Sequence, residues 1–291
     1  MKTFLECVPC FVGQALGAAR FVTDDETVHE KVLRKVTAKA SEMDLSMTPP
    51  MMGQEIHRLI RQITGNKDPY RNIKNHSNQL ALQMYPRLRE KIKHSADPFE
   101  TAVRIAIAGN IIDFAKMNGL DDAKIHQAIE DSFTANLSES AVNYLRDAIK
   151  QSENILYLGD NAGEIVFDRL LLEQLPCEKI TFVVRGGPVI NDATMNDALT
   201  AGVTELVEVI DNGSDGPGTV METCSQQFRR RFDTADLIVA KGQGNYETLS
   251  DEDKNIFFLF KVKCPVIAKD AGLEVGSLAL KKKNAAGIPE N

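Results

Sequence analysis

Carboxylate and amide side chains follow a short apolar run in the C-terminal half of the chain. The run at 155–158 ends in Gly-Asp-Asn-Ala-Gly-Glu, which supplies Asp160, Asn161 and Glu164. Oxygen donors of this kind suit Mg²⁺ or Mn²⁺ better than zinc, because no histidine or thiolate stands among them. The two glycines would let the backbone approach a ligand closely, and the amides that open the following helix could hold an anion. The motif therefore predicts a phosphate bridged to a divalent cation.

Charged side chains also follow the later apolar runs of this half. They are Arg185 and Asp192 after the second run, Lys241 after the fourth and Lys263 just before the fifth. Ligands of parallel α/β sheets bind beyond the carboxyl ends of the strands, so we expect these side chains to share one rim. Asp160 and Asp192 are the candidate catalytic residues, and with Asn161 they are the candidate metal ligands. The cations are candidates for binding substrate.

Each of these residues also has an ordinary structural interpretation. In a single βα turn, Asp160 or Asn161 would more often cap a helix than bind a ligand, and Asp192 could cap the next helix. The agreement of four strand ends favours the ligand-binding interpretation. Residues 241–245 are glycine-rich but lack the order of a phosphate-binding nucleotidase loop, and no Gly-x-Gly-x-x-Gly follows the first run.

Two kinds of element must position these residues. Residues 11–149 place apolar side chains at helical spacing, interrupted at Pro49-Pro50, with a kink expected at Pro86. From residue 154 onward, apolar runs alternate with helical patterns, and strands are expected at 155–158, 180–184, 206–210, 237–240 and 265–268. The last of the helical patterns spans residues 246–260. This alternation predicts a mainly parallel sheet with helices on both faces. The prediction is an all-α domain at 1–150 and a Rossmann-like α/β/α domain at 151–291.

Two features of the N-terminal half are further candidates. Asn110 and Asp113 interrupt an apolar segment on one helix face, three residues apart, and are candidates for substrate binding, although a solvated or capping role is nearly as plausible. Cys7 and Cys10 form a Cys-x-x-Cys pair that could chelate a soft metal. A tetrahedral site needs two more ligands, so we prefer a structural or incidental role over zinc.

The composition limits the class of protein. Of 291 residues, 43% are hydrophobic and 26% are charged, which is ordinary for a globular chain. The net charge of -7, with no long basic run, makes nucleic acid an unfavourable partner. Glu6 lies where a signal peptide needs an apolar core, and no stretch approaches the roughly 18 apolar residues of a membrane span. The odd number of cysteines does not resemble a disulfide framework. We expect a cytoplasmic protein that acts on a small molecule; the oligomeric state is not indicated.

Five motifs resemble those of the damage-control phosphatases, a family long catalogued as domain of unknown function 89. They are Cys7-Val8-Pro9-Cys10, Gly109-Asn110-Ile111-Ile112-Asp113-Phe114, Gly159-Asp160-Asn161-Ala162-Gly163-Glu164, Arg185-Gly186-Gly187-Pro188-Val189-Ile190-Asn191-Asp192-Ala193-Thr194 and Lys241-Gly242-Gln243-Gly244-Asn245-Tyr246-Glu247. The resemblance extends from the N-terminus to about residue 280, and the Cys-x-x-Cys suggests the small prokaryotic branch.

The resemblance implies a metal-dependent phosphatase of small phosphometabolites, such as sugar phosphates or damaged cofactor intermediates. The cofactor would be a divalent ion (Mn, Mg, Co or Ni) held by Asp160, Asn161 and Asp192. Glu164 would contact substrate and Lys263 would pair with phosphate. The implied substrate loop consists of Gln243, Gly244, Asn245 and Tyr246, and Gln243 departs from the acidic residue that eukaryotic relatives tend to carry.

In the implied mechanism, the cation and Lys263 or Lys241 neutralise the phosphoryl oxygens while water or a carboxylate attacks in line. If Asp160 were the nucleophile, a covalent phosphoenzyme would form. Two other classes compete: a transferase that binds an adenosine ligand on the Rossmann-like layer, and a non-catalytic metal-binding protein centred on Cys7 and Cys10. The absence of a glycine-rich adenosine loop disfavours the transferase.

Overall fold

The N-terminal half is all-α, as predicted. The computed structural model describes residues 1–110 and 122–282. Within them, the helices of this half are α1 (Cys7–Val22), α2 (Glu26–Glu42), α3 (Pro49–Thr64), α4 (Arg71–Lys93), α5 (Pro98–Ala108), α7 (Asp122–Ser132) and α8 (Glu139–Gln151). Pro49 and Pro50 occupy the first turn of α3, where a missing amide hydrogen costs nothing, so the predicted break is a helix start. No helix of the described part is both long and apolar enough to cross a membrane.

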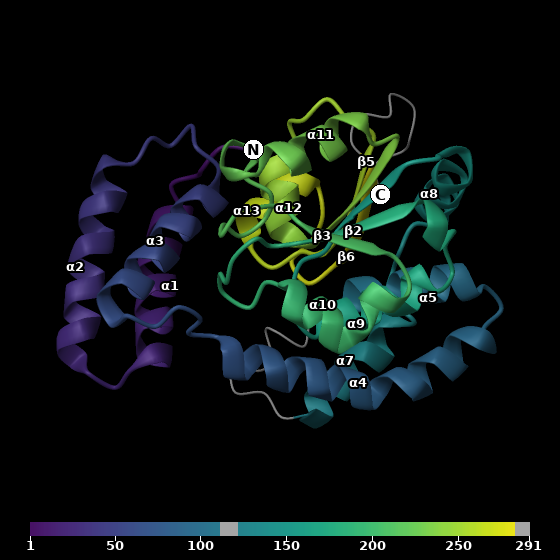
Figure 1. Ribbon diagram of the computed structural model, residues 1–291, viewed down its shortest axis with the longest axis horizontal. Helices are drawn as coiled ribbons and strands as arrows, with labels where there is room; N and C mark the ends of the chain where they lie inside the picture. The colour runs from purple at the N-terminus through teal and green to yellow at the C-terminus, as the bar shows by residue number, and fades with distance from the viewer. Residues whose placement is uncertain (111–121, 283–291) are drawn as a thin grey trace.

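The C-terminal half contains a six-stranded sheet, and the predicted mainly parallel α/β class is confirmed (Figure 1). The strands are β1 (Ile155–Leu158), β2 (Ile180–Val184), β3 (Glu208–Asp211), β4 (Leu237–Lys241), β5 (Ile256–Lys261) and β6 (Leu278–Lys282). Their order is β3-β2-β1-β4-β5-β6, with β1 to β5 parallel and β6 antiparallel to β5. The chain therefore winds in opposite directions from β1 and from β4, and the switch point lies between these two strands.

The fifth strand lies elsewhere than predicted. Residues 265–268 belong to a helix, α13 (Pro265–Ala271), which begins with Pro265 at its first position. The strand is instead the run Ile-Phe-Phe-Leu-Phe-Lys of β5, which the sequence prediction had placed at the end of a helix. Five of its six residues are buried, because β5 is covered by helices on both faces, and such a run has no alternation to distinguish it from a buried helix.

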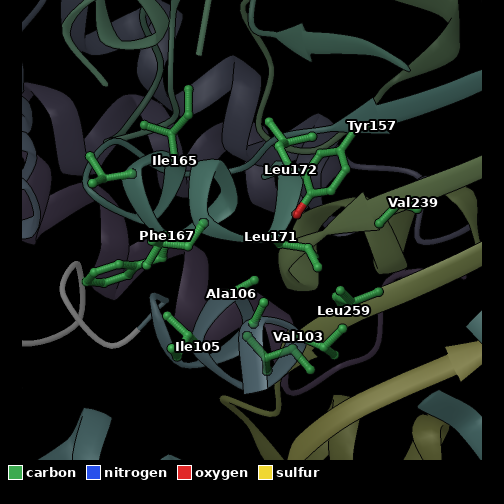
Figure 2. Close-up of a cluster of buried hydrophobic side chains, with 14 of the residues drawn as sticks. Val103, Ile105, Ala106, Tyr157, Ile165, Phe167, Leu171, Leu172, Val239 and Leu259 are labelled. Atoms are coloured by element: carbon green, nitrogen blue, oxygen red, sulfur yellow. The ribbon is translucent and has the colours of Figure 1, made fainter. Parts of the chain in front are cut away.

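Helices cover both faces of the sheet (Figure 1). One layer contains α4, α5, α9 (Glu164–Leu172) and α10 (Met195–Ala201), and the other contains α11 (Gln226–Thr234), α12 (Gly242–Leu249) and α13. Successive residues of β1 point to opposite layers: Tyr157 packs with α5 and α9, whereas Leu158 packs with α11 and α12. Figure 2 shows side chains of α5 and α9, such as Val103 and Leu171, beside Val239 and Leu259 of the sheet.

Helices α1 to α3 have a small apolar core of their own, which includes Ala15, Val32 and Ile56. They stand beside the α/β part rather than over a face of the sheet (Figure 1). In contrast, α4, α5 and α8 share one core cluster with the sheet strands. The division at residue 150 stays a prediction, and this shared core crosses it.

Candidate active site

The backbone joins the turns that follow β1 and β2. Asn161 and Asp192 form an isolated antiparallel bridge, and the Ala193 amide donates to the Asp160 carbonyl oxygen at 2.7 Å. The three predicted metal ligands, Asp160, Asn161 and Asp192, are therefore brought together at the carboxyl end of the sheet, and all three are buried. The site lies beside the switch point between β1 and β4, where ligands of such sheets bind.

The helix-capping interpretation of these residues is wrong. The N-cap of α9 is Gly163, which has no side chain to bond the helix amides. The N-cap of α10 is Thr194, whose hydroxyl forms a capping box with Asp197. The side chains of Asp160 and Asp192 therefore do not cap the helices that follow them.

Arg185 spans the two carboxylates. Its Nε donates to Asp192 Oδ2 at 2.6 Å, and its Nη2 donates to Asp160 Oδ1 at 3.4 Å. The side chain is only 1% exposed, and Nη1 has no hydrogen-bond partner among the residues that the structure describes. The guanidinium therefore brings one unused donor into a buried, negatively charged site.

Two amides connect Asp160 with Glu164. The Nδ2 atoms of Asn110 and Asn161 donate to Glu164 Oε2 at 3.0 Å and 2.9 Å. They also donate to Asp160 Oδ2, at 3.4 Å and 2.9 Å respectively. Asn110 thus joins the site from the end of α5, whereas Asp113 lies outside the described residues. Since the Asn161 nitrogen donates to these carboxylates and has no lone pair to offer, its Oδ1 is the side-chain atom that a metal could use.

Lys241 lies behind Glu164 and not at an open surface. Its Nζ donates to Glu164 Oε1 at 2.7 Å, to Asp168 Oδ1 at 2.5 Å and to the Ala106 carbonyl oxygen at 2.8 Å. The side chain is 0% exposed, and its three donors are used. Burial opposes the charge, but Asp168 and Glu164 raise the pKa of Lys241 above its usual value. These contacts fit a lysine that fixes Glu164 better than one that binds substrate.

Burial controls the protonation of the carboxyl groups. It raises the pKa of Asp160 to about 8, with further contributions from Asp192 and Glu164, while Arg185 and Lys263 act in the opposite direction. Burial also raises the pKa of Asp192, against the effect of Arg185. Arg185 and Lys263 therefore do not offset the effect of burial on the two carboxyl groups. An added cation would favour the ionised form of both.

A glycine at the start of α12 allows the backbone to approach Asp160. Gly242 has φ +79°, and a Cβ atom there would lie 1.8 Å from Asp160 Oδ2. Residue 242 must therefore be glycine both for its backbone conformation and for the space that the carboxylate occupies.

The residues of the predicted substrate loop have different surroundings. Asn245 is buried and accepts from Thr219 Oγ1 at 2.7 Å, and Tyr246 donates its hydroxyl to Asp270 at 2.9 Å. Gly244 packs against Gly218. Gln243 accepts from the Lys263 amide at 3.2 Å and donates to Glu247 at 2.8 Å, so it ties the loop to the exposed Lys263. Lys263 is exposed and Gln243 is partly buried, whereas Asn245 and Tyr246 are buried.

The two thiols of the Cys-x-x-Cys lie near Glu247 and Cys264, which both contact Gln243. Burial raises the pKa of Cys7 and of Cys10, and Glu247 and Cys264 raise both further. A third cysteine and a carboxylate distant in sequence are thus close enough to affect them. Even so, over residues 1–110 and 122–282 no group of three or more His, Cys, Asp or Glu residues is arranged to hold a metal. The predicted set at the strand ends, with two carboxylates and one amide, is smaller than such a group and needs oxygens of water or substrate.

Asn78 and Asp168 are site residues that the sequence analysis missed. Asn78 Oδ1 accepts from the Gly163 amide at 2.6 Å, and its Nδ2 donates to Asp197 at 2.9 Å. The Gly163 amide is therefore not free for the anion that was expected at this helix start. Asp168, fully buried, accepts from Lys241 and from the Tyr157 hydroxyl. The sequence does contain a signal for Asp168: it follows Glu164 by four residues, so the two carboxylates share one helix face.

A doubly wound α/β protein with paired carboxylates, amides and buried cations at its switch point belongs to the class of α/β proteins whose ligands bind at that point. The family model described as "Damage-control phosphatase ARMT1-like domain" matches residues 3–279. The chain therefore belongs to the damage-control phosphatase family.

Relatives match along almost their whole length. The chain is 37% identical over 293 residues to a protein named damage-control phosphatase from Archaeoglobus fulgidus, covering 97% of this chain and 99% of that protein. It is 34% identical over 285 residues to a damage-control phosphatase of Pyrococcus horikoshii, covering 96% and 97% of the two chains. A crystal structure of a DUF89 family protein from P. horikoshii superimposes with a TM-score of 0.86, at 32% identity, covering 98% of this chain and 100% of that one.

Proposed function

We propose that this protein is a metal-dependent phosphatase that hydrolyses phosphoric monoesters of small metabolites, such as sugar phosphates or damaged cofactor intermediates. The observation that carries the proposal is the convergence of Asp160, Asn161 and Asp192 with the buried cation Arg185 at the switch point. The names of the relatives support the reaction class, since two of them are damage-control phosphatases.

The residues present fit a divalent ion. Asp160, Asn161 and Asp192 would hold it through oxygen atoms, which matches Mg²⁺ or Mn²⁺ and also allows Co²⁺ or Ni²⁺. The glycine at 242 leaves room for the Asp160 carboxylate, which a Cβ atom there would displace. When bound, such an ion supplies charge neutralisation of the phosphoryl oxygens.

Arg185, Lys263 and Glu164 would bind the phosphoryl group and accept a proton. Arg185 Nη1, which has no partner in the described part of the chain, would donate to a phosphoryl oxygen, and Lys263 would approach the phosphate from the exposed side. Glu164 is held by Asn110, Asn161 and Lys241, so its carboxylate keeps one orientation toward Asp160 and can accept a proton there.

The test is phosphate release from a panel of sugar phosphates and a generic aryl phosphate, with Mg²⁺, Mn²⁺, Co²⁺ and Ni²⁺ added in turn to metal-stripped protein. We expect activity with at least one ion and its loss in Asp160→Ala and in Asp192→Ala, with both variants folded by circular dichroism. Absence of activity with every ion would rule out the proposal.

The nucleophile needs a separate measurement. Acid quenching during turnover of a ³²P-labelled substrate should leave the label on the protein if Asp160 attacks phosphorus. If water attacks, all of the label should appear as free phosphate.

A further inference from the structure

The contacts of Arg185 have a consequence for metal binding. Its guanidinium bonds the same two carboxylates that would hold the ion, at 2.6 Å to Asp192 and 3.4 Å to Asp160. Water does not screen these contacts, because Arg185, Asp160 and Asp192 are all at least nine-tenths buried. A divalent ion and the guanidinium therefore compete for the same negative charge at close range.

The unused donor of Arg185 points to what relieves that competition. A buried donor without an acceptor costs free energy, and Nη1 has no acceptor among the described residues. When both are ionised, Asp160 and Asp192 carry two negative charges against one positive charge on Arg185. A divalent ion would reverse the sign of this group, so that an anion beside Nη1 would then be attracted.

We propose that Arg185 is a positioning residue that couples the two ligands of the site: it acts as the counter-ion of Asp160 and Asp192 without metal, opposes metal binding, and turns to phosphate when the ion is bound. This inference rests on the proposed function, which assigns the metal ion to Asp160 and Asp192. By linkage, phosphate must then tighten metal binding by the same factor as metal tightens phosphate binding.

The experiment is calorimetric titration of Mn²⁺ into metal-stripped protein, with and without inorganic phosphate, for the wild type and Arg185→Gln. In the wild type, we expect phosphate to tighten Mn²⁺ binding by roughly tenfold, within the usual range of coupling between sites. In Arg185→Gln, Mn²⁺ alone should bind roughly tenfold more tightly than to the wild type, and phosphate should no longer change its affinity. Equal or weaker Mn²⁺ binding, or an unchanged effect of phosphate, would overturn the proposal.

Two controls make the result specific. Arg231→Gln removes the same charge from a half-exposed arginine that pairs with Glu208 on β3, and it should leave both Mn²⁺ affinities unchanged. If Arg185→Gln does not fold, Arg185→Lys keeps the charge but cannot span both carboxylates. Arg185→Lys should bind Mn²⁺ somewhat more tightly than the wild type and respond less to phosphate. Wild-type Mn²⁺ affinities with and without phosphate in this variant would refute the coupling.

The proposed function can fail separately. If Mn²⁺ binds Asp160→Ala as tightly as the wild type, the ion is not at these carboxylates and the metal assignment is wrong. If Asp160→Ala loses Mn²⁺ while Arg185→Gln behaves as the wild type, the site is correct and only the role of Arg185 is wrong.

Discussion

Gly242→Ala should inactivate the enzyme at a modest cost in stability. Two effects add at this position: φ is +79°, and the new Cβ would lie 1.8 Å from Asp160 Oδ2. The backbone conformation costs about 1–2 kcal/mol for a residue with a side chain. Real Cβ atoms keep at least 3.0 Å from such a neighbour, so the carboxylate would have to move by about 1.2 Å.

That displacement is large for a carboxylate that is proposed to hold the metal ion. A shift of about 1 Å can reduce a rate by roughly 100-fold, so we expect a loss of at least this order in kcat. The free energy of unfolding should fall by only a few kcal/mol, because the clash is with one side chain and not with the sheet. The assays are phosphate release with the preferred ion and urea unfolding followed by circular dichroism.

The matched control is Gly272→Ala. Gly272 has φ +68°, almost the same as Gly242, but a Cβ there would meet nothing within 4 Å. It should lose about 1–2 kcal/mol of stability and keep its activity. Gly242→Ala with nearly wild-type kcat, or equal loss of activity in both variants, would refute the placement of Asp160.

Three further predictions concern the supports of the site. Lys241→Met leaves two buried carboxylates without their cation and should lower the free energy of unfolding by about 3–5 kcal/mol in urea, whereas Lys93→Met, at an exposed position, should change it little. Burial raises the pKa of Glu247 from 4.5 to about 7, so the folded state pays to ionise it, and wild-type stability should fall as pH rises from about 4.5 through 7. Urea unfolding at pH 5 and pH 8 should therefore show Glu247→Gln gaining on the wild type by up to about 3 kcal/mol, and a pH-independent difference would contradict this. Asn78→Ala removes the acceptor of the Gly163 amide and should cost about 1–3 kcal/mol, with kcat reduced more than KM is raised.

The sequence allowed most of the sheet and the centre of the site to be predicted. Asp160, Asn161 and Asp192 could be grouped because each lies in the turn after an apolar run, and parallel strands deliver such turns to one edge. The supporting contacts could not be predicted in the same way. Asn78 meets Gly163 across 85 positions of sequence, and nothing local in α4 indicates that partner.

The charge of a residue also could not show how deeply its side chain is buried. Lys241 and Lys263 were predicted as equivalent cations of the rim, yet the structure buries the first among Glu164 and Asp168 and exposes the second. The difference follows from position in the sheet: Lys241 is the last residue of a central strand, whereas Lys263 lies in a connection beyond β5. A sequence pattern reports the residue type at a strand end but not how many helices close over it.

One carboxylate joins α3 to the α/β part through three side chains. Asp215, in the loop after β3, accepts from Gln54 at 2.8 Å and pairs with Arg58 at 2.7 Å and with Arg61. Arg61 also donates to the Pro188 carbonyl oxygen at 2.7 Å, in the loop that carries Asp192. In evolutionary terms, these helices can diverge as a unit, because their own core is separate and the polar contacts to Asp215 and Pro188 come from only a few residues of α3.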